Sequence, residues 1–167
     1  MPGRTSSAAE KSSSAADSAG SSEDAVSMLL DDQLCFALYS AAHGVQRLYR
    51  PLLERLNLTY PQYLVLLVLW EDDGLSVTEI GERLSLNSAT LTPLLKRMEA
   101  AGILERHRSK SDGRRVTVSL LPKGKKLKSK VSKVTADVTC AAIDATPNAV
   151  ELRDTLNRLR QQLPAAL

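Results

Sequence analysis

The sequence predicts one mainly helical domain with a single small β-hairpin. Apolar residues recur at helical spacing through most of the chain, and two capping-box patterns, Thr59–Gln62 and Ser76–Glu79, each open a predicted helix. One pair of short strand-like runs flanks a glycine-containing turn. The 167 residues are enough for one domain with a sizeable core. Residues 1–26, rich in serine and alanine, are expected to remain a disordered tail.

Composition excludes several classes of protein. Two cysteines far apart in the sequence, Cys35 and Cys140, exclude a dense disulfide scaffold. Neither His43 nor His107 has metal-ligand spacing with a cysteine, so we expect no metal and no cofactor. No apolar run approaches the roughly 20 residues of a membrane span. We therefore expect a cytoplasmic chain without a membrane partner.

Residues 27–58 are expected to form an N-terminal dimerisation region. Seven apolar residues from Leu34 to Leu56 recur at steps of three and four on one long helix. Pro51 predicts a kink or a break near Arg47. A stripe this regular on so long a helix is typical of packing against a partner helix.

Cys35 lies just past the first turn of this predicted helix, in a row with Tyr49 at heptad spacing. The two residues are fourteen positions apart, which is about 21 Å on a straight helix. They can therefore meet only across an antiparallel pair of chains. A lone helical cysteine is most often a packing residue, so the residues alone leave Cys35 between packing and chemistry.

Residues 59–121 are expected to form a DNA-binding region. Thr59–Gln62 caps a helix, and Ser76–Glu79 opens a short second helix. A third helix is predicted from Ser88 to just before Gly102. The second and third helices, joined by about three residues, make a helix-turn-helix.

Pro93 conflicts with this third helix, because it leaves the Ala89 carbonyl without its donor. A helix capped at Thr92 and starting later is the alternative. We retain the earlier start, capped by Asn87 or Ser88, because it preserves the spacing of the helix-turn-helix.

A basic hairpin follows the third helix. Ile103–Arg108 and Arg114–Leu120 are strand-like, and Ser109–Gly113 supplies the turn. From Arg106 to Lys130 there are ten lysines or arginines against one acidic residue. A basic hairpin directly after a helix-turn-helix is the wing of a winged-helix domain, and this charge favours a phosphate-rich partner over a merely solvated face.

Short side chains on the third helix can approach base edges in the major groove, and the basic ones can reach phosphates. Wing arginines can enter a minor groove, and an acidic wing residue can brace them. The candidate DNA-binding residues are Ser88, Ala89, Thr90, Thr92, Lys96, Arg97, Asp112, Arg114 and Arg115.

Residues 122–167 are expected to form C-terminal dimerisation helices. One helix follows Pro122, and Thr146–Pro147 is predicted to cap a last helix carrying a leucine stripe that ends at Leu163. These stripes exceed what one small winged domain buries, which indicates a twofold homodimer. The fold class is thus mainly α with a β-hairpin wing, a winged helix-turn-helix with a helical dimerisation region.

Three segments, Leu30–Ser40, Leu58–Tyr63 and Leu91–Arg97, resemble the organic-hydroperoxide-sensing (OhrR) branch of the MarR family of winged-helix regulators. The resemblance implies a dimeric repressor that binds double-stranded operator DNA when reduced. It also implies release of the DNA when an organic hydroperoxide oxidises Cys35. The family members are regulators, so no enzyme activity and no catalytic residue is implied.

The resemblance assigns further roles. Cys35 matches the peroxide-reactive cysteine, and Cys140 falls where two-cysteine members keep the cysteine that resolves it in an inter-subunit disulfide. Tyr49 and Tyr60 match tyrosines that hydrogen-bond the thiolate from the partner subunit, with Tyr39 in support. In the wing, Asp112 and Arg114 match the family pattern, whereas Gly113 and Arg115 depart from it.

Two other functions are compatible with the sequence. In one, a MarR-type repressor is released by a small phenolic ligand, and Cys35 is a packing residue. In the other, the chain is a thiol peroxidase, although no obvious cysteine and histidine pair supports it.

Overall fold

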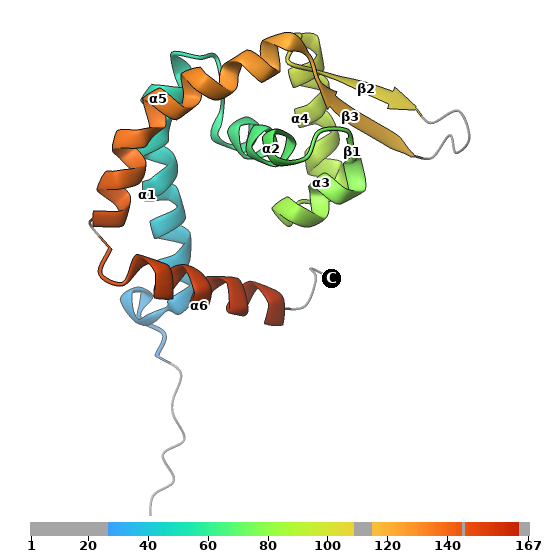
Figure 1. Cartoon of the computed structure of the whole chain (residues 1–167). Coiled ribbons are helices and arrows are strands. Elements are labelled where there is room, and N and C mark those ends of the chain that lie inside the picture. The colour runs from blue at the N-terminus through green and yellow to red at the C-terminus, as the bar shows by residue number, and fades with distance from the viewer. Residues whose placement is uncertain (1–26, 109–114, 145, 164–167) are drawn as a thin grey trace, which may run out of the picture. The chain divides into compact units, whose positions relative to one another are not determined.

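The computed structural model describes residues 27–108, 115–144 and 146–163. The chain divides into two compact units between Ala37 and Leu38. The mainly helical class with one small sheet is confirmed (Figure 1). The elements, in order, are a 3-10 turn at Leu30–Asp32, α1 Leu34–Glu54, α2 Tyr60–Glu71, β1 Leu75–Ser76, α3 Val77–Leu84, α4 Ser88–Ala100, β2 Leu104–Arg108, β3 Val116–Leu120, α5 Pro122–Asp144 and α6 Ala149–Gln162.

Helix α1 differs from the predicted helix at its start. The helix begins at Leu34, after the 3-10 turn and an extended Gln33, whose side-chain amide donates to the Leu29 carbonyl at 3.2 Å. Cys35 therefore lies inside the first turn of α1, and its predicted place beyond that turn is wrong.

Pro51 does not split α1, so a break near Arg47 is wrong, whereas a kink there stays a prediction. The proline withholds a donor from the Arg47 carbonyl, yet it stands only one turn from the last residue of the helix, Glu54. The loss of one hydrogen bond so close to an end leaves the rest of α1 intact.

The capping boxes of α2 and α3 are confirmed. The Thr59 amide donates to Gln62 Oε1 at 2.9 Å. At α3 the exchange is reciprocal, because the Ser76 amide donates to Glu79 Oε2 at 2.7 Å and the Glu79 amide donates to Ser76 Oγ at 3.2 Å. These side chains satisfy N–H groups that a helix start leaves free.

Helix α4 begins at Ser88, as predicted, and contains Pro93. Asn87 is its N-cap, since Asn87 Oδ1 accepts from the Thr90 amide at 2.9 Å. Gly102 follows the helix with φ +69°, a conformation that favours glycine, and ends it as predicted.

The sheet has the order β1-β3-β2 and is antiparallel throughout. The two predicted wing strands are β2 and β3, with Leu104 opposite Leu120 and Arg108 opposite Val116. Their predicted turn lies outside the described residues. Strand β1 was not predicted; it pairs Leu75 with Val118.

The core lies between α2, α3, α4, the hairpin, the end of α1 and the first half of α5. Its largest fully buried side chains are Leu53, Val65, Leu66, Leu69, Ile80, Leu91, Leu95, Met98, Leu104, Val118 and Val131. By contrast, Leu48 on α1 and Leu152 on α6 are 53% and 46% exposed. The apolar stripes of the terminal helices are thus incompletely buried within one chain.

Helix α6 begins later than predicted. Its N-cap is Asn148 with φ +56°, so the predicted cap at Thr146–Pro147 is wrong. Asn tolerates this left-handed conformation, which redirects the chain into the helix. Leu163 lies just past the helix end. The regional boundaries at 27–58, 59–121 and 122–167 stay a prediction.

None of the helices in the described ranges is both long and apolar enough to cross a membrane. In the same ranges, histidine, cysteine and acidic residues do not gather into a group of three that could hold a metal ion.

Gly124 is predicted to be essential for stability. A Cβ at this position would lie 2.3 Å from the Ile103 carbonyl oxygen, where backbone must move. We expect Gly124→Ala to lower the free energy of unfolding by about 2 kcal/mol or more. Gly44→Ala is the control, because a Cβ there meets nothing within 4 Å and a mid-helix alanine gains up to about 1 kcal/mol. Denaturant unfolding at one protein concentration measures both, and equal stability of Gly124→Ala and wild type would contradict the clash.

Candidate nucleic-acid interface and thiol sites

A groove of about 760 Å³ runs between the start of α3, one face of α4 and the strands of the wing. Four cationic side chains and no acidic one line it. The groove therefore offers positive charge beside short hydroxyl side chains, a combination suited to a phosphate backbone and base edges. Its lining residues are Ser76, Val77, Thr78, Ser88, Thr92, Lys96, Arg106, Arg108, Arg115 and Val116.

The groove brings together part of the predicted DNA-binding set, namely Ser88, Thr92, Lys96 and Arg115. The other described members are exposed on α4 outside the lining; they are Ala89, Thr90 and Arg97. Asp112 and Arg114 lie outside the described residues.

Sequence reasoning missed six of the ten lining residues, among them Thr78, Arg106 and Arg108. Arg106 and Arg108 are two apart on β2, and alternate residues of a strand share a face. This alternation could have indicated that the two arginines face the same side of the wing. Thr78 required knowledge of how α3 sits beside the wing.

The cations of the groove differ in their partners. Arg106 is bound by Glu99, and Arg115 Nη2 lies 3.7 Å from Glu79 Oε2. Within the described ranges, Lys96 and Arg108 have no acidic partner. Among the described residues, no ion pair has to break for these two side chains to contact an anionic partner.

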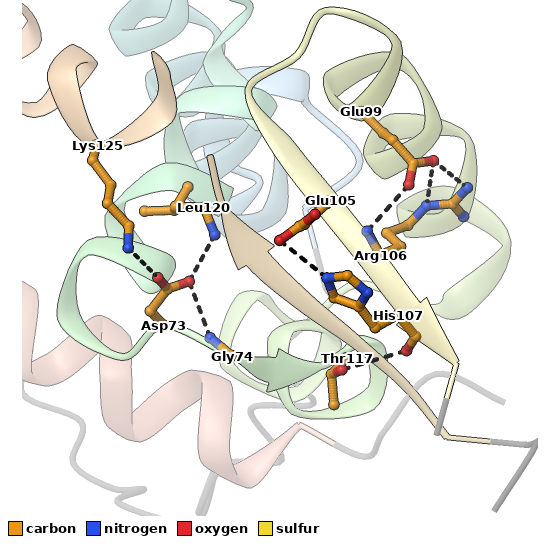
Figure 2. A network of polar contacts seen from close by, with 9 residues as sticks. All are labelled: Asp73, Gly74, Glu99, Glu105, Arg106, His107, Thr117, Leu120 and Lys125. Atoms are coloured by element: carbon orange, nitrogen blue, oxygen red, sulfur yellow. Dashed lines mark hydrogen bonds and ion pairs between the residues drawn. The ribbon is translucent and has the colours of Figure 1, made fainter. Parts of the chain in front are cut away.

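The pair of Glu99 and Arg106 joins the last turn of α4 to strand β2 (Figure 2). The Arg106 amide donates to Glu99 Oε1 at 3.1 Å, and its Nε and Nη2 donate to Oε2 at 2.9 and 2.6 Å. These side-chain hydrogen bonds are the main reason why the pKa of Glu99 lies below its usual 4.5, although desolvation opposes them. Helix α4, the second helix of the helix-turn-helix and here called the recognition helix, is thereby joined to the wing.

The lowered pKa of Glu99 predicts an acid-sensitive contribution to stability. A depressed carboxyl pKa stabilises the fold above the ordinary pKa of 4.5, and the effect is lost as pH falls through the folded pKa. We expect wild type to lose more stability than Glu99→Gln between about pH 5 and pH 3. Thermal unfolding over this range is the measurement, with Glu105→Gln as the charge-matched control. Parallel curves for wild type and Glu99→Gln would contradict the prediction.

Three tyrosines gather between α1 and α2. The ring centroids of Tyr49 lie 5.4 Å from Tyr60 and 5.7 Å from Tyr63, and those of Tyr60 and Tyr63 lie 6.0 Å apart. The predicted Tyr49 and Tyr60 are thus neighbours. Tyr63 also belongs to the cluster but was not predicted, because it stands at the start of an apolar run and was assigned to the core. The predicted Tyr39 stands apart, 63% exposed, with its ring centroid 4.3 Å from that of His43.

Burial is the main cause that raises the pKa of Tyr60 and of Tyr63 above 10, and the neighbouring tyrosines add to it. Both hydroxyls therefore stay protonated at neutral pH and remain hydrogen-bond donors. An apolar pocket of about 430 Å³ lies over Tyr49 and Tyr60, between α1, the end of α5 and α6.

Both cysteines are free and exposed. Cys35 lies in the first turn of α1, and Cys140 lies near the end of α5. They belong to different compact units. Both thiols are therefore accessible to an oxidant, whereas their pairing and the contact of Cys35 with tyrosines stay predictions.

Curated proteins similar to this chain are transcriptional regulators. The HTH-type transcriptional regulator TtmR of Methylorubrum extorquens is 50% identical over 149 residues, which cover 82% of this chain and 75% of TtmR. The organic hydroperoxide resistance transcriptional regulator of Bacillus subtilis is 43% identical over 136 residues, covering 81% and 92%.

Solved structures of AbfR are also similar. Reduced AbfR bound to DNA is 34% identical with a TM-score of 0.67, covering 79% of this chain and 89% of AbfR. A disulfide-formed AbfR is 36% identical with a TM-score of 0.57, covering 78% and 91%. The family model of the transcriptional regulator SarA/Rot matches residues 47–131. The chain therefore belongs to the SarA/Rot and MarR type of winged-helix transcriptional regulators, in the organic-hydroperoxide-sensing (OhrR) branch.

Proposed function

We propose that this regulator is a repressor that binds operator DNA as a homodimer when reduced and leaves it when an organic hydroperoxide oxidises Cys35. The observation that carries the proposal is an exposed thiol in the first turn of α1, in a chain that also presents a basic groove beside its recognition helix. The 43% identity to an organic hydroperoxide resistance regulator supports hydroperoxides as the signal.

The groove supports a specific mode of DNA binding. Helix α4 would enter the major groove with Ser88 and Thr92 toward the base edges and Lys96 toward a phosphate. Arg108 at the end of β2 and Arg115 just before β3 would follow the adjacent backbone toward the minor groove. The DNA-bound structure of the relative AbfR supports this use of the fold.

The exposed apolar residues of the terminal helices support a homodimer. Leu34 and Leu48 on α1 are 64% and 53% exposed, and Val150 and Leu152 on α6 are 63% and 46% exposed. Large apolar side chains exposed along two helices mark an association surface, and a twofold axis lets the same surface serve both chains. A dimer also presents two recognition helices to two half-sites of a palindrome.

The dimer explains how tyrosines could serve the thiol. Cys35 and Tyr49 lie fourteen residues apart on one unbroken helix, so Tyr49 must act on the Cys35 of the partner subunit. Tyr49 and Tyr60 are neighbours, and the Tyr60 hydroxyl remains a protonated donor. We propose that the pair donates hydrogen bonds to the thiolate, with Tyr39 in support.

The proposed redox step is a two-electron oxidation of Cys35. Its thiolate attacks a peroxide oxygen, so an S–O bond forms, the O–O bond breaks and the alcohol leaves after taking a proton. The Cys140 thiolate of the partner subunit then attacks the sulfenic sulfur. An S–S bond forms, the S–O bond breaks, and the oxygen leaves as hydroxide, which takes a proton to become water.

A disulfide requires Cα atoms within about 7 Å. The bond would therefore fix the start of α1 of one chain against α5 of the other. Such a constraint would change the separation of the two recognition helices, and the operator would be released. The disulfide form of AbfR supports this second step.

The test uses duplexes that the reduced protein selects from a random-sequence pool. Fluorescence anisotropy should show tight binding by the reduced protein, loss of binding after cumene hydroperoxide, and recovery with dithiothreitol. Mass spectrometry should find Cys35 joined to Cys140, and non-reducing electrophoresis should show a covalent dimer. If a small thiol such as glutathione is found on Cys35 instead, that thiol replaces Cys140 as the resolving group, and Cys35 remains the sensor.

Two outcomes would favour the other candidates. Release of DNA by a phenolic compound without any thiol oxidation would indicate a ligand-controlled repressor. Catalytic consumption of peroxide with a thiol reductant would indicate a peroxidase.

A further inference from the structure

The carboxylate of Asp73 joins β3 to α5 at the base of the wing (Figure 2). Its Oδ1 accepts from the Leu120 amide at 2.8 Å and from the Gly74 amide at 3.1 Å. Its Oδ2 lies 3.3 Å from Lys125 Nζ. Leu120 is the last residue of β3, and Lys125 lies at the end of the first turn of α5.

The Asp73 carboxylate accepts a hydrogen bond from β3 for which the short strand β1 offers no backbone carbonyl. Strand β1 pairs with β3 only at Val118 and Thr117, and the Gly74 amide donates to the Val118 carbonyl at 3.1 Å. Two residues further along β3, the Leu120 amide points to the same side, where β1 offers no carbonyl. The Asp73 carboxylate accepts this amide instead, and it reaches α5 with its other oxygen.

Neighbouring contacts hold the same end of α5 to the DNA-binding elements. The Trp70 indole donates to the Gly124 carbonyl at 3.1 Å, and Lys128 Nζ donates to the Trp70 carbonyl at 3.3 Å. On the far side of the hairpin, Glu99 and Arg106 bind β2 to α4. Asp73 thus lies where α5, a predicted dimerisation helix, meets the wing, and the wing is itself joined to the recognition helix α4 by Glu99 and Arg106.

We propose that Asp73 is a positioning residue that couples α5 to the wing and thereby sets how strongly oxidation weakens operator binding. This inference rests on the proposed function. Helix α5 runs unbroken from Lys125 to Cys140, so a displacement imposed at the thiol is carried along one rigid element to the Asp73 contact. The carboxylate passes that displacement to β3, whose first residue, Val116, lines the groove next to Arg115.

The test compares operator dissociation constants of oxidised and reduced protein. We expect the oxidised-to-reduced ratio to fall about fivefold in Asp73→Ala, which loses both amide contacts and the ion pair. It should fall about twofold in Lys125→Met, because the ion pair is exposed and weak alone. Lys125→Arg keeps the charge and should restore the wild-type ratio. Arg50→Met, which removes an exposed pair on α1, is the control.

Amide hydrogen exchange at Leu120 supplies a readout that needs no redox chemistry. Exchange at this residue should accelerate in Asp73→Ala and stay unchanged in Arg50→Met. Two results would overturn the coupling: unchanged exchange at Leu120 in Asp73→Ala, or an unchanged affinity ratio in both Asp73→Ala and Lys125→Met. If the wild-type ratio is large in that case, the proposed function still stands. A wild-type ratio near one would overturn the proposed function and this inference with it. If Asp73→Ala fails to fold, Asp73→Asn, which retains an acceptor oxygen but no charge, replaces it and should match Lys125→Met.

Discussion

Replacing Cys35 by serine is expected to abolish the response to hydroperoxide while leaving operator binding intact. The side chain is exposed, so exchanging sulfur for oxygen costs little packing. A serine hydroxyl is not ionised at neutral pH and cannot form a sulfenic acid, so the peroxide finds no thiolate to give it two electrons. The measurement is the operator dissociation constant of Cys35→Ser before and after cumene hydroperoxide, which should be equal.

Cys140→Ser is the matched comparison, because it removes the other exposed thiol. This variant should still be oxidised at Cys35, but no covalent dimer should appear in non-reducing electrophoresis. A Cys35→Ser protein that still releases DNA under peroxide would place the sensor elsewhere. A covalent dimer in Cys140→Ser would show that Cys35 is not resolved by Cys140.

The helices of the DNA-binding region could be predicted because their ends depend on contacts within a few residues. The Ser76 and Glu79 exchange spans three positions, as does the bond from Thr90 to Asn87. Strand β1 could not be predicted in this way. It has two residues, and its existence depends on Val118, more than forty positions later in the chain.

The groove could be predicted only in part for a similar reason. Periodicity places Ser88, Thr92 and Lys96 on one side of α4, but it does not reveal which wing residues face them. Arg106 and Arg108 line the groove because of the register between β2 and β3. The start of α1 was not predicted either. Gln33 is extended, so the helix begins only at Leu34 and Cys35 lies in its first turn.

Removing Lys96 and Arg108 from the groove is expected to cause the second large effect. Lys96 and Arg108 are exposed and, among the described residues, have no acidic partner, so Lys96→Ala with Arg108→Ala should leave the fold intact. A dimer would lose four phosphate contacts. We expect operator affinity to fall about 100-fold at physiological salt, and the slope of log affinity against log salt to become shallower by about 3 to 4.

The salt slope separates direct contact from a general change in charge. Lys126→Ala with Lys130→Ala removes the same charge from α5, outside the groove lining, and should change both the affinity and the slope far less. Equal losses in the two double variants would show that the protein's overall field, and not this groove, holds the DNA. A lower affinity at an unchanged slope would mean that Lys96 and Arg108 read bases instead of phosphates, because counterion release follows only the neutralised phosphates.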